Sequence, residues 1–167
     1  KKIPKDSKII LLLRSDVIKL LFGKSGDINK PITSGGIELR WYESNYKSSG
    51  TPLMKMIFHK MSQSIGGTYS IEDIRNNFFP KKEAVFNYIM SRTFGRPRDV
   101  VSFLNIYKKN YPNDAKVVKE HLLEIEKEYS DWFYSEISNE LKMTGRFDEI
   151  KDVIGMISEL GRGEFTY

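Results

Sequence analysis

Three arginines lie close together in the stretch from Arg92 to Arg98, just before an apolar-periodic segment that predicts a helix. Pro97 suits the first position of that helix, because the N–H it lacks would have no partner within the helix. Guanidinium groups match phosphate well, since their planar fork donates two parallel hydrogen bonds, and a helix N-terminus also favours anions. Arg92, Arg96 and Arg98 are therefore candidate phosphate-binding residues. The alternative is that they pair with acidic neighbours and fix a corner between two helices.

A second polar group follows the apolar run of residues 8–13, which reads Lys-Ile-Ile-Leu-Leu-Leu. Such a run is typical of a strand buried on both faces of a parallel sheet. Arg14, Ser15 and Asp16 come directly after it, at the strand end where open α/β folds bind their ligands. These three residues are candidate ligand contacts, or else they simply cap the short helix predicted to follow.

Several kinds of chemistry are excluded by what the 167 residues lack. There is no cysteine, which rules out disulfides, thiolate zinc sites and cysteine nucleophiles. The two histidines, His59 and His121, lie far apart in helical patterns, and we expect packed or solvated side chains and no metal site. Gly23-Lys24-Ser25 is only a fragment of a phosphate-binding loop. No apolar run is long enough to span a membrane, so the expected location is the cytoplasm.

The first elements predict a small βαβ unit. The predicted strand at residues 8–13, the helix at 17–22 and the alternating strand at 37–42 come in that order, with a Gly/Ser/Asn-rich loop at 23–36. Connections of this type nearly always join parallel strands. Two parallel strands form no stable sheet alone, so we expect an upstream domain or another chain to complete the sheet.

The rest of the chain is predicted to be helical, which makes the fold class mainly α. Helix signals are the proline at position 52, the Ser70-x-x-Asp73 capping box and the apolar stripe of the longest helix, with Asn113 or Asp114 as its cap. Helices are expected from 52 to about 63, from 70 to about 78, over 84–90, from 97 to about 110, over about 114–142 and over 147–160.

Three motifs, taken in order, resemble a known family. They are Lys-Ile-Ile-Leu-Leu-Leu-Arg-Ser-Asp at 8–16, Ile-Glu-Leu-Arg-Trp at 37–41 and Arg-Thr-Phe-Gly-Arg-Pro-Arg-Asp-Val at 92–100. Over residues 8–142 the chain resembles the C-terminal half of bacterial P-loop ATPases of the STAND and AAA+ group, in particular a poorly characterised family of them. The resemblance implies a remnant of the nucleotide-binding α/β domain at 1–43, a helical lid at 44–142 and the start of a winged-helix module at 143–167.

The same resemblance implies roles for the candidate residues. Arg14, Ser15 and Asp16 match the first sensor, near the attacking water and the γ-phosphate. Arg96 and Arg98, with Arg92 as a third candidate, match the second sensor, which reads the nucleotide phosphates from the lid. The parent protein would hold ATP with magnesium, whereas this chain lacks the phosphate-binding loop and is expected to bind no nucleotide tightly and to be inactive alone.

Two other functions fit the composition. A net charge of +5 and a pI near 9.2 permit DNA binding by a helical or winged-helix module. Alternatively, the aromatic-striped long helix is the interface of a helical protein-interaction domain. The partners expected from the sequence are thus an upstream nucleotide-binding domain or a second chain, with a homo-oligomer and nucleic acid as further alternatives. The sequence shows no nucleophile–base pair that would indicate another class of enzyme.

Overall fold

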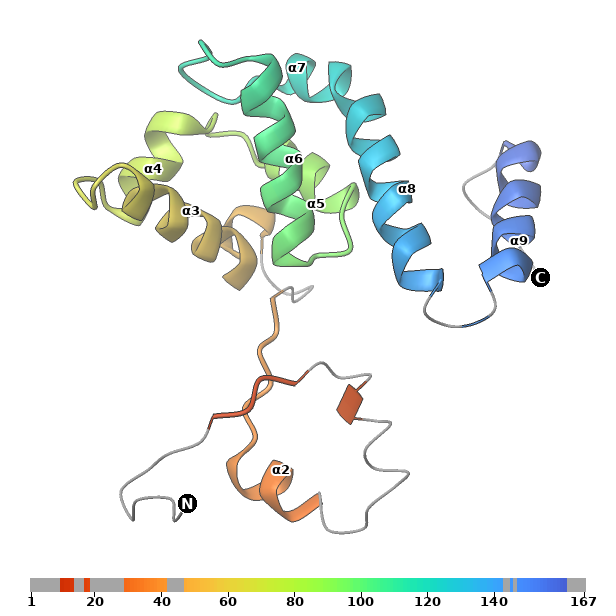
Figure 1. Ribbon diagram of the computed structural model, residues 1–167. Helices are drawn as coiled ribbons and strands as arrows, with labels where there is room; N and C mark the ends of the chain where they lie inside the picture. Colours follow the sequence, from red (N-terminus) through yellow and green to blue (C-terminus); the bar gives the residue numbers. More distant parts are fainter. Residues whose placement is uncertain are drawn as a thin grey trace. The chain divides into compact units, whose positions relative to one another are not determined.

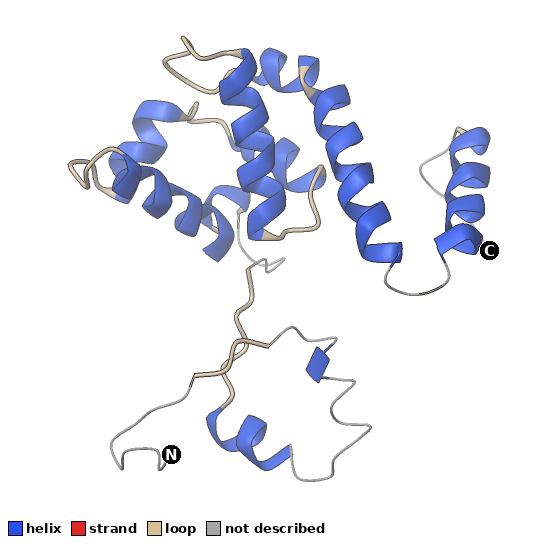
Figure 2. Cartoon of the chain, in the orientation of Figure 1, coloured by secondary structure: helices blue, strands red, loops and turns tan. Residues whose placement is uncertain are grey.

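The computed structural model describes residues 10–13, 17–18, 29–41, 47–142, 145 and 147–161. The chain divides into two compact units, Lys1–Leu39 and Arg40–Tyr167. The first unit contains α2 (Asn29–Gly35), and the second contains all the later helices (Figure 1). The fold is mainly helical, as predicted, and Figure 2 shows helices and loops but no strand among the residues that it colours.

The predicted βαβ unit is not seen. Residues 10–13 and 36–41 are not in strands, and α2 occupies part of the predicted 23–36 loop. Ile10, Leu12 and Ile37 are each more than 80% exposed, at 84%, 86% and 87%. A strand needs hydrogen bonds from a neighbouring strand, and the described part of the first unit supplies none. The apolar pattern therefore favours pairing with another strand, and no described residue forms such a pair.

Among its described residues, the second unit contains the short 3-10 helix η1 (Ser48–Gly50) followed by seven α-helices. Most of them begin and end where the sequence signals predict. They are α3 (Pro52–Ser64), α4 (Ile71–Phe78), α5 (Glu83–Ser91), α6 (Pro97–Asn110), α7 (Lys119–Glu124), α8 (Glu126–Lys142) and α9 (Phe147–Leu160).

Local capping explains two of these starts. The hydroxyl of Thr51 accepts a hydrogen bond from the N–H of Met54 at the beginning of α3, where Pro52 occupies the first turn. Ser70 and Asp73 form the predicted capping box of α4, in which each side chain accepts a hydrogen bond from the other residue's backbone N–H. Both caps satisfy N–H groups that a helix start would otherwise leave without partners.

The single long helix predicted near residues 114–142 is instead two helices, α7 and α8, which meet at Ile125. Neither Asn113 nor Asp114 is the cap, because Val118 holds that position. Asp114 lies four residues before that cap, and its carboxylate instead accepts from Tyr107 and contacts His121. Ile125 lies at the bend and is only 4% exposed, which fixes the bend against the core.

The core contains side chains from every helix from α3 to α8, together with Phe79 and Ile125. Phe58, Phe79 and Phe86 form an aromatic cluster with ring centroids 5.3 to 6.0 Å apart. The rings of Phe103 and Tyr129 meet edge-on, with centroids 4.6 Å apart, and join α8 to α6. These rings bury much apolar area with defined geometry, and they hold α6 in the middle of the bundle.

Candidate functional site

The arginine-rich stretch is the corner between α5 and α6. Gly95 has a φ of +66°, which a residue with a side chain rarely adopts, so glycine allows the tight turn. The carboxylate of Asp99 accepts a hydrogen bond from the backbone N–H of Phe94 at 3.1 Å and from the Nε of Arg96 at 3.0 Å. Asp99 therefore holds the corner closed from inside the first turn of α6.

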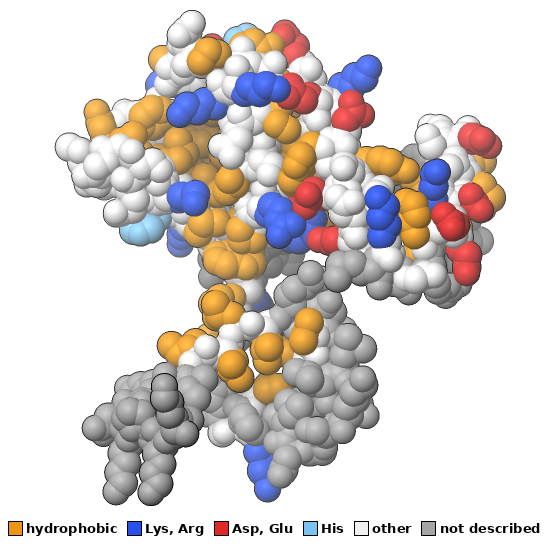
Figure 3. All heavy atoms as spheres, in the orientation of Figure 1, with side chains coloured by type: hydrophobic (Ala, Val, Ile, Leu, Met, Phe, Trp, Pro, Cys, Tyr) orange, Lys and Arg blue, Asp and Glu red, His pale blue; other side chains and the backbone are white. Residues whose placement is uncertain are grey.

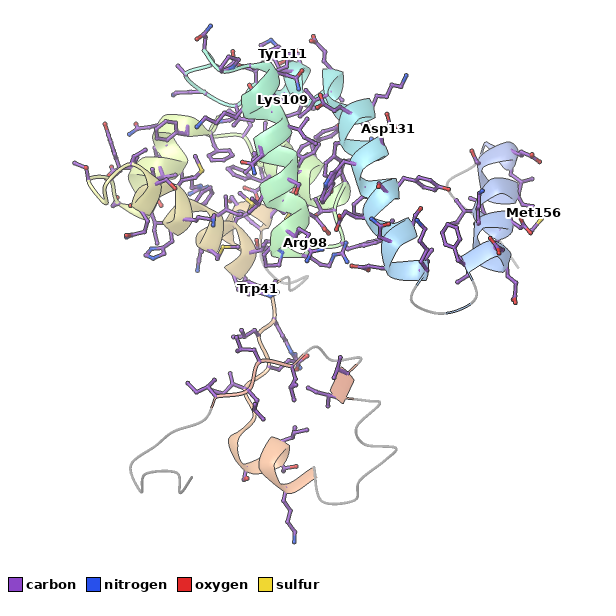
Figure 4. All side chains as sticks on the ribbon, viewed as in Figure 1. Trp41, Arg98, Lys109, Tyr111, Asp131 and Met156 are labelled. Carbon is purple, nitrogen blue, oxygen red and sulfur yellow. The ribbon has the colours of Figure 1, made fainter. Side chains whose placement is uncertain are left out.

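Each of the three arginines pairs with a carboxylate on α8. Arg92 contacts Glu126 at 2.8 Å, Arg96 contacts Glu140 at 2.9 Å, and Arg98 contacts Glu136 at 2.8 Å. Figure 4 shows Arg98 at the start of α6, close to α8. We name Arg92, Arg96, Arg98 and Asp99 the arginine corner. Its contacts match the second alternative drawn from the sequence, a set of ion pairs that fixes one helix against another.

The ion pairs of the arginine corner differ greatly in burial. The Asp99 side chain is fully buried and that of Arg96 is 34% exposed, whereas the Arg98 side chain is 69% exposed. The hydrogen bonds that Arg96 donates to Asp99 raise the pKa of Arg96 above its ordinary value, and the charges of Asp99 and Glu140 act in the same direction. Arg96 is thus held by buried charge, while the Arg98 guanidinium remains accessible to solvent.

Aromatic rings lie against two of the guanidinium groups of the arginine corner. The guanidinium of Arg92 lies 5.2 Å from the ring centroid of Tyr88, and that of Arg96 lies 5.3 Å from the ring of Phe94. The ring of Phe94 in turn contacts Phe133 of α8 at 4.8 Å. Cation–π contacts of this kind favour a fixed guanidinium orientation. The corner is therefore held by both charge and stacking.

A second feature is an apolar groove of about 420 Å³ between α3, α4, α6 and the loop before α7. Figure 3 shows hydrophobic side chains gathered between α3–α4 and α6, with Lys or Arg side chains around them. We call it the lysine-bordered groove. Its lining includes Ile57, Lys60, Met61, Ile65, Ile74, Phe78, Val101, Leu104, Lys108, Tyr111, Lys116 and Val117.

The charge at the lysine-bordered groove is positive. Lys60, Lys108 and Lys116 line it, and none of them forms an ion pair with the residues that the structure describes. The one carboxylate in the lining, that of Asp114, is engaged by Tyr107 and His121. An apolar floor with unpaired ammonium groups at its edge suits an apolar ligand that also carries negative charge.

A comparison with known protein families decides what kind of domain this is. The FunZ-associated C-terminal helical domain, FunZ_C, matches residues 51–138, more than half of the chain. The chain belongs to the FunZ_C family. No curated protein and no solved structure matches the chain. The match runs from the cap of α3 into the last part of α8, and it includes the whole groove lining and the arginine corner.

The FunZ_C domain also contains a polar cluster that the sequence did not reveal. His121 Nδ1 lies 2.7 Å from Asp114 Oδ2, and the hydroxyl of Tyr107 donates to the same carboxylate. The ring of Tyr111 stacks on His121 with centroids 3.9 Å apart. Because α6, the loop after it and α7 together bring these residues into contact, spacing in the sequence gave no signal beyond a histidine in a helical pattern.

Burial and hydrogen bonding shift the titration of this cluster. Burial, together with the hydrogen bond to Asp114, raises the pKa of Tyr107 to about 12. The hydrogen bonds from Tyr107 and His121 lower the pKa of the Asp114 carboxyl. A histidine beside a carboxylate can move protons, but among the residues that the structure describes no serine or threonine side chain is hydrogen-bonded to His121. The cluster therefore serves to hold the loop at the end of the groove.

Arg14, Ser15 and Asp16, the predicted first-sensor residues, lie outside the described residues. Among the residues that the structure describes, no group of three or more histidine or acidic side chains is placed to hold a metal ion. No helix in that same part of the chain is long and apolar enough to cross a membrane. The expected relation to STAND and AAA+ ATPases stays a prediction.

Proposed function

We propose that this chain is a helical docking domain that binds FunZ, the protein for which its family is named. The single observation that carries the proposal is the lysine-bordered groove, whose apolar floor is open and whose three lysines have no carboxylate partner among the described residues. The ligand that this chemistry favours is a FunZ segment with an apolar face and acidic flanks, seated as a helix in a groove.

The rest of the domain supports a binding role. The lining comes from three helices and one loop that the buried aromatic cluster holds in place. A preformed groove loses little conformational entropy on binding, which favours affinity. The ion pairs of the arginine corner fix α8 against α5 and α6. They thereby hold α6 in place, and α6 supplies part of the groove lining.

A calorimetric titration of the chain against FunZ tests the proposal. Ile65 lines the groove and is 40% exposed, so Ile65→Asp places a charge on the apolar floor without opening the core. We expect this variant to bind FunZ at least about tenfold more weakly, since an apolar ligand would have to bury the new carboxylate.

A matched control is available on α7. Leu123 is 48% exposed and lies outside the groove, so Leu123→Asp makes the same chemical change elsewhere. We expect Leu123→Asp to bind FunZ like the unmodified chain. Equal binding by all three proteins would show that the groove is not the docking site.

A second candidate function is the nucleotide sensing implied by the resemblance to P-loop ATPases. It draws support from the Arg98 guanidinium, which is largely exposed at a helix N-terminus and could exchange Glu136 for a phosphate. The exposed apolar residues Ile10, Leu12 and Ile37 further favour a sheet completed by another domain. In this proposal ATP with magnesium is held by that domain, Arg14, Ser15 and Asp16 act as the first sensor, and Arg92, Arg96 and Arg98 act as the second.

ATP hydrolysis by the assembled protein tests the sensor proposal. Arg98→Ala should impair hydrolysis while leaving the unfolding transition of the chain unchanged, because this ion pair is solvent-exposed. Arg75→Ala is the control, since Arg75 pairs with Glu72 on α4 and lies outside the corner. Normal hydrolysis by the Arg98 variant would remove that residue's sensor role.

A further inference from the structure

The last helix presents an apolar face that nothing in the described chain covers. Val153, Met156, Ile157 and Leu160 of α9 are 49%, 56%, 42% and 60% exposed. Their spacing of three, four and seven residues places them on one face of the helix. Figure 4 shows Met156 on the side of α9 that is turned away from α8.

Acidic side chains border this face. Asp152 lies one turn before Met156, and Glu159 lies one turn after it. Neither carboxylate forms an ion pair with the residues that the structure describes. Both carboxylates lie on the Met156 side of the apolar face, so the exposed face of α9 is apolar with one negative edge. This edge is opposite in charge to the lysines of the lysine-bordered groove.

We propose that the α9 helix of a second copy of this chain lies in the lysine-bordered groove and closes it until FunZ displaces that helix. The inference rests on the proposed docking function, because it assigns a competitor to the same groove. Val153, Met156, Ile157 and Leu160 provide the anchor spacing by which an amphipathic helix binds in a groove. Asp152 and Glu159 meet the ammonium groups of Lys60, Lys108 and Lys116.

The chain's own α9 does not fill its own groove in this structure. α9 contacts α8. The Nζ of Lys142, at the end of α8, lies 5.5 Å from the ring centroid of Phe147, at the start of α9. The groove is on the α3–α4 side of α6, and α8 packs against α6 through Tyr129 and Phe103. A second copy can supply the same helix without disturbing the α8–α9 contact.

Because each chain carries both the groove and the helix, two copies can exchange helices reciprocally. Such an exchange uses the same surfaces on both partners, and it buries two helix faces in one closed dimer. Two contacts formed together hold more strongly than one, since the second forms within an existing complex.

Sedimentation velocity over a range of concentrations tests the inference. We expect the unmodified chain to dimerise, and Ile65→Asp in the groove or Ile157→Asp on α9 to weaken the dimer at least about tenfold. Leu123→Asp is again the control and should dimerise normally. An equimolar mixture of the two defective variants should associate, because one keeps an intact groove and the other an intact helix.

The FunZ titration separates this inference from the proposed function. If α9 competes with FunZ, Ile157→Asp should bind FunZ more tightly than the unmodified chain, while Ile65→Asp binds more weakly. A chain that is monomeric at every concentration would overturn the inference and leave docking untouched, provided Ile65→Asp still weakens FunZ binding. Dimers that require Ile65 and Ile157, with FunZ binding unaffected by either change, would instead overturn the docking function.

Discussion

At the scale of single residues, the Tyr129 hydroxyl is a buried polar group without a hydrogen-bond partner among the described residues. Tyr129 is 2% exposed, and its hydroxyl forms no hydrogen bond with the described part of the protein. Burial, with the nearby charge of Asp99, raises the pKa of this hydroxyl far above its ordinary value, so it stays neutral. A buried hydroxyl without a partner costs free energy that the same ring without the hydroxyl would not.

We therefore predict that Tyr129→Phe stabilises the protein by about 1 kcal/mol. Tyr107→Phe is the matched control, because the Tyr107 hydroxyl donates to Asp114 and accepts from the N–H of Val118. That control should destabilise the protein by about 1 kcal/mol or more. Urea unfolding of the three proteins gives both values, and a destabilised Tyr129→Phe protein would mean that the hydroxyl has a partner.

The Asp114 carboxyl predicts a pH dependence in acid. Its pKa in the folded protein lies below the ordinary value because Tyr107 and His121 hydrogen-bond to its ionised form. The folded state therefore binds this proton less readily than the unfolded state. The resulting stabilisation is present above the unfolded pKa, near about 4, and is lost as the pH falls through the folded pKa.

The Asp114→Asn variant isolates this contribution. We expect the free energies of unfolding of the two proteins to differ most at neutral pH and to converge below about pH 4. Unfolding by urea at a series of pH values measures the difference. A constant difference across the acid range would show that Asp114 has the same pKa in both states.

At the scale of elements, the arginine corner predicts an unequal contribution from its carboxylates. Asp99 is fully buried, whereas the Arg96 side chain is 34% exposed and keeps Glu140 as a partner. Asp99→Asn removes the buried charge of this pair and should cost about 2 kcal/mol, less than the loss of a fully buried pair. Glu136→Gln removes the partner of the exposed Arg98 and should cost less than about 1 kcal/mol. Thermal unfolding distinguishes the two, and equal losses would contradict the burial argument.

Local signals predicted the helices well and their packing poorly. Pro52, the Ser70–Asp73 capping box and Pro97 act within one turn, so the starts of α3, α4 and α6 follow from neighbouring residues. The bend at Ile125 depends on a core formed by other helices, so no neighbouring residue in the sequence predicts it.

The candidate sites show the same division. The arginine cluster was visible in the sequence, but its partners Glu126, Glu136 and Glu140 are 34 to 44 residues away from it. The groove combines residues of three helices and a loop, which no single periodic pattern contains. The prediction of a strand at residues such as 37–41 was wrong for a related reason. A strand depends on a neighbouring strand, and the described chain provides none.

At the scale of the whole molecule, the buried core lies within the second unit, Arg40–Tyr167. Leu12 belongs to the first unit and is 86% exposed. We predict that Leu12→Lys leaves the thermal unfolding of the helical core unchanged and lowers aggregation, because it interrupts an exposed apolar run. Calorimetry and light scattering check the two effects. A large fall in the melting temperature would show that Leu12 contributes to the core.

The positions of the two tryptophans have a practical consequence for spectroscopy. Trp41 is packed against the core, and its carbonyl accepts the N–H of Leu53 at the start of α3. Trp132 sits on α8, with its ring 5.6 Å from that of Tyr129. Since the chain has no other tryptophan, replacing Trp41 by phenylalanine leaves an intrinsic fluorophore on α8 alone. Its emission maximum would report loosening of that helix in real time, without any attached dye.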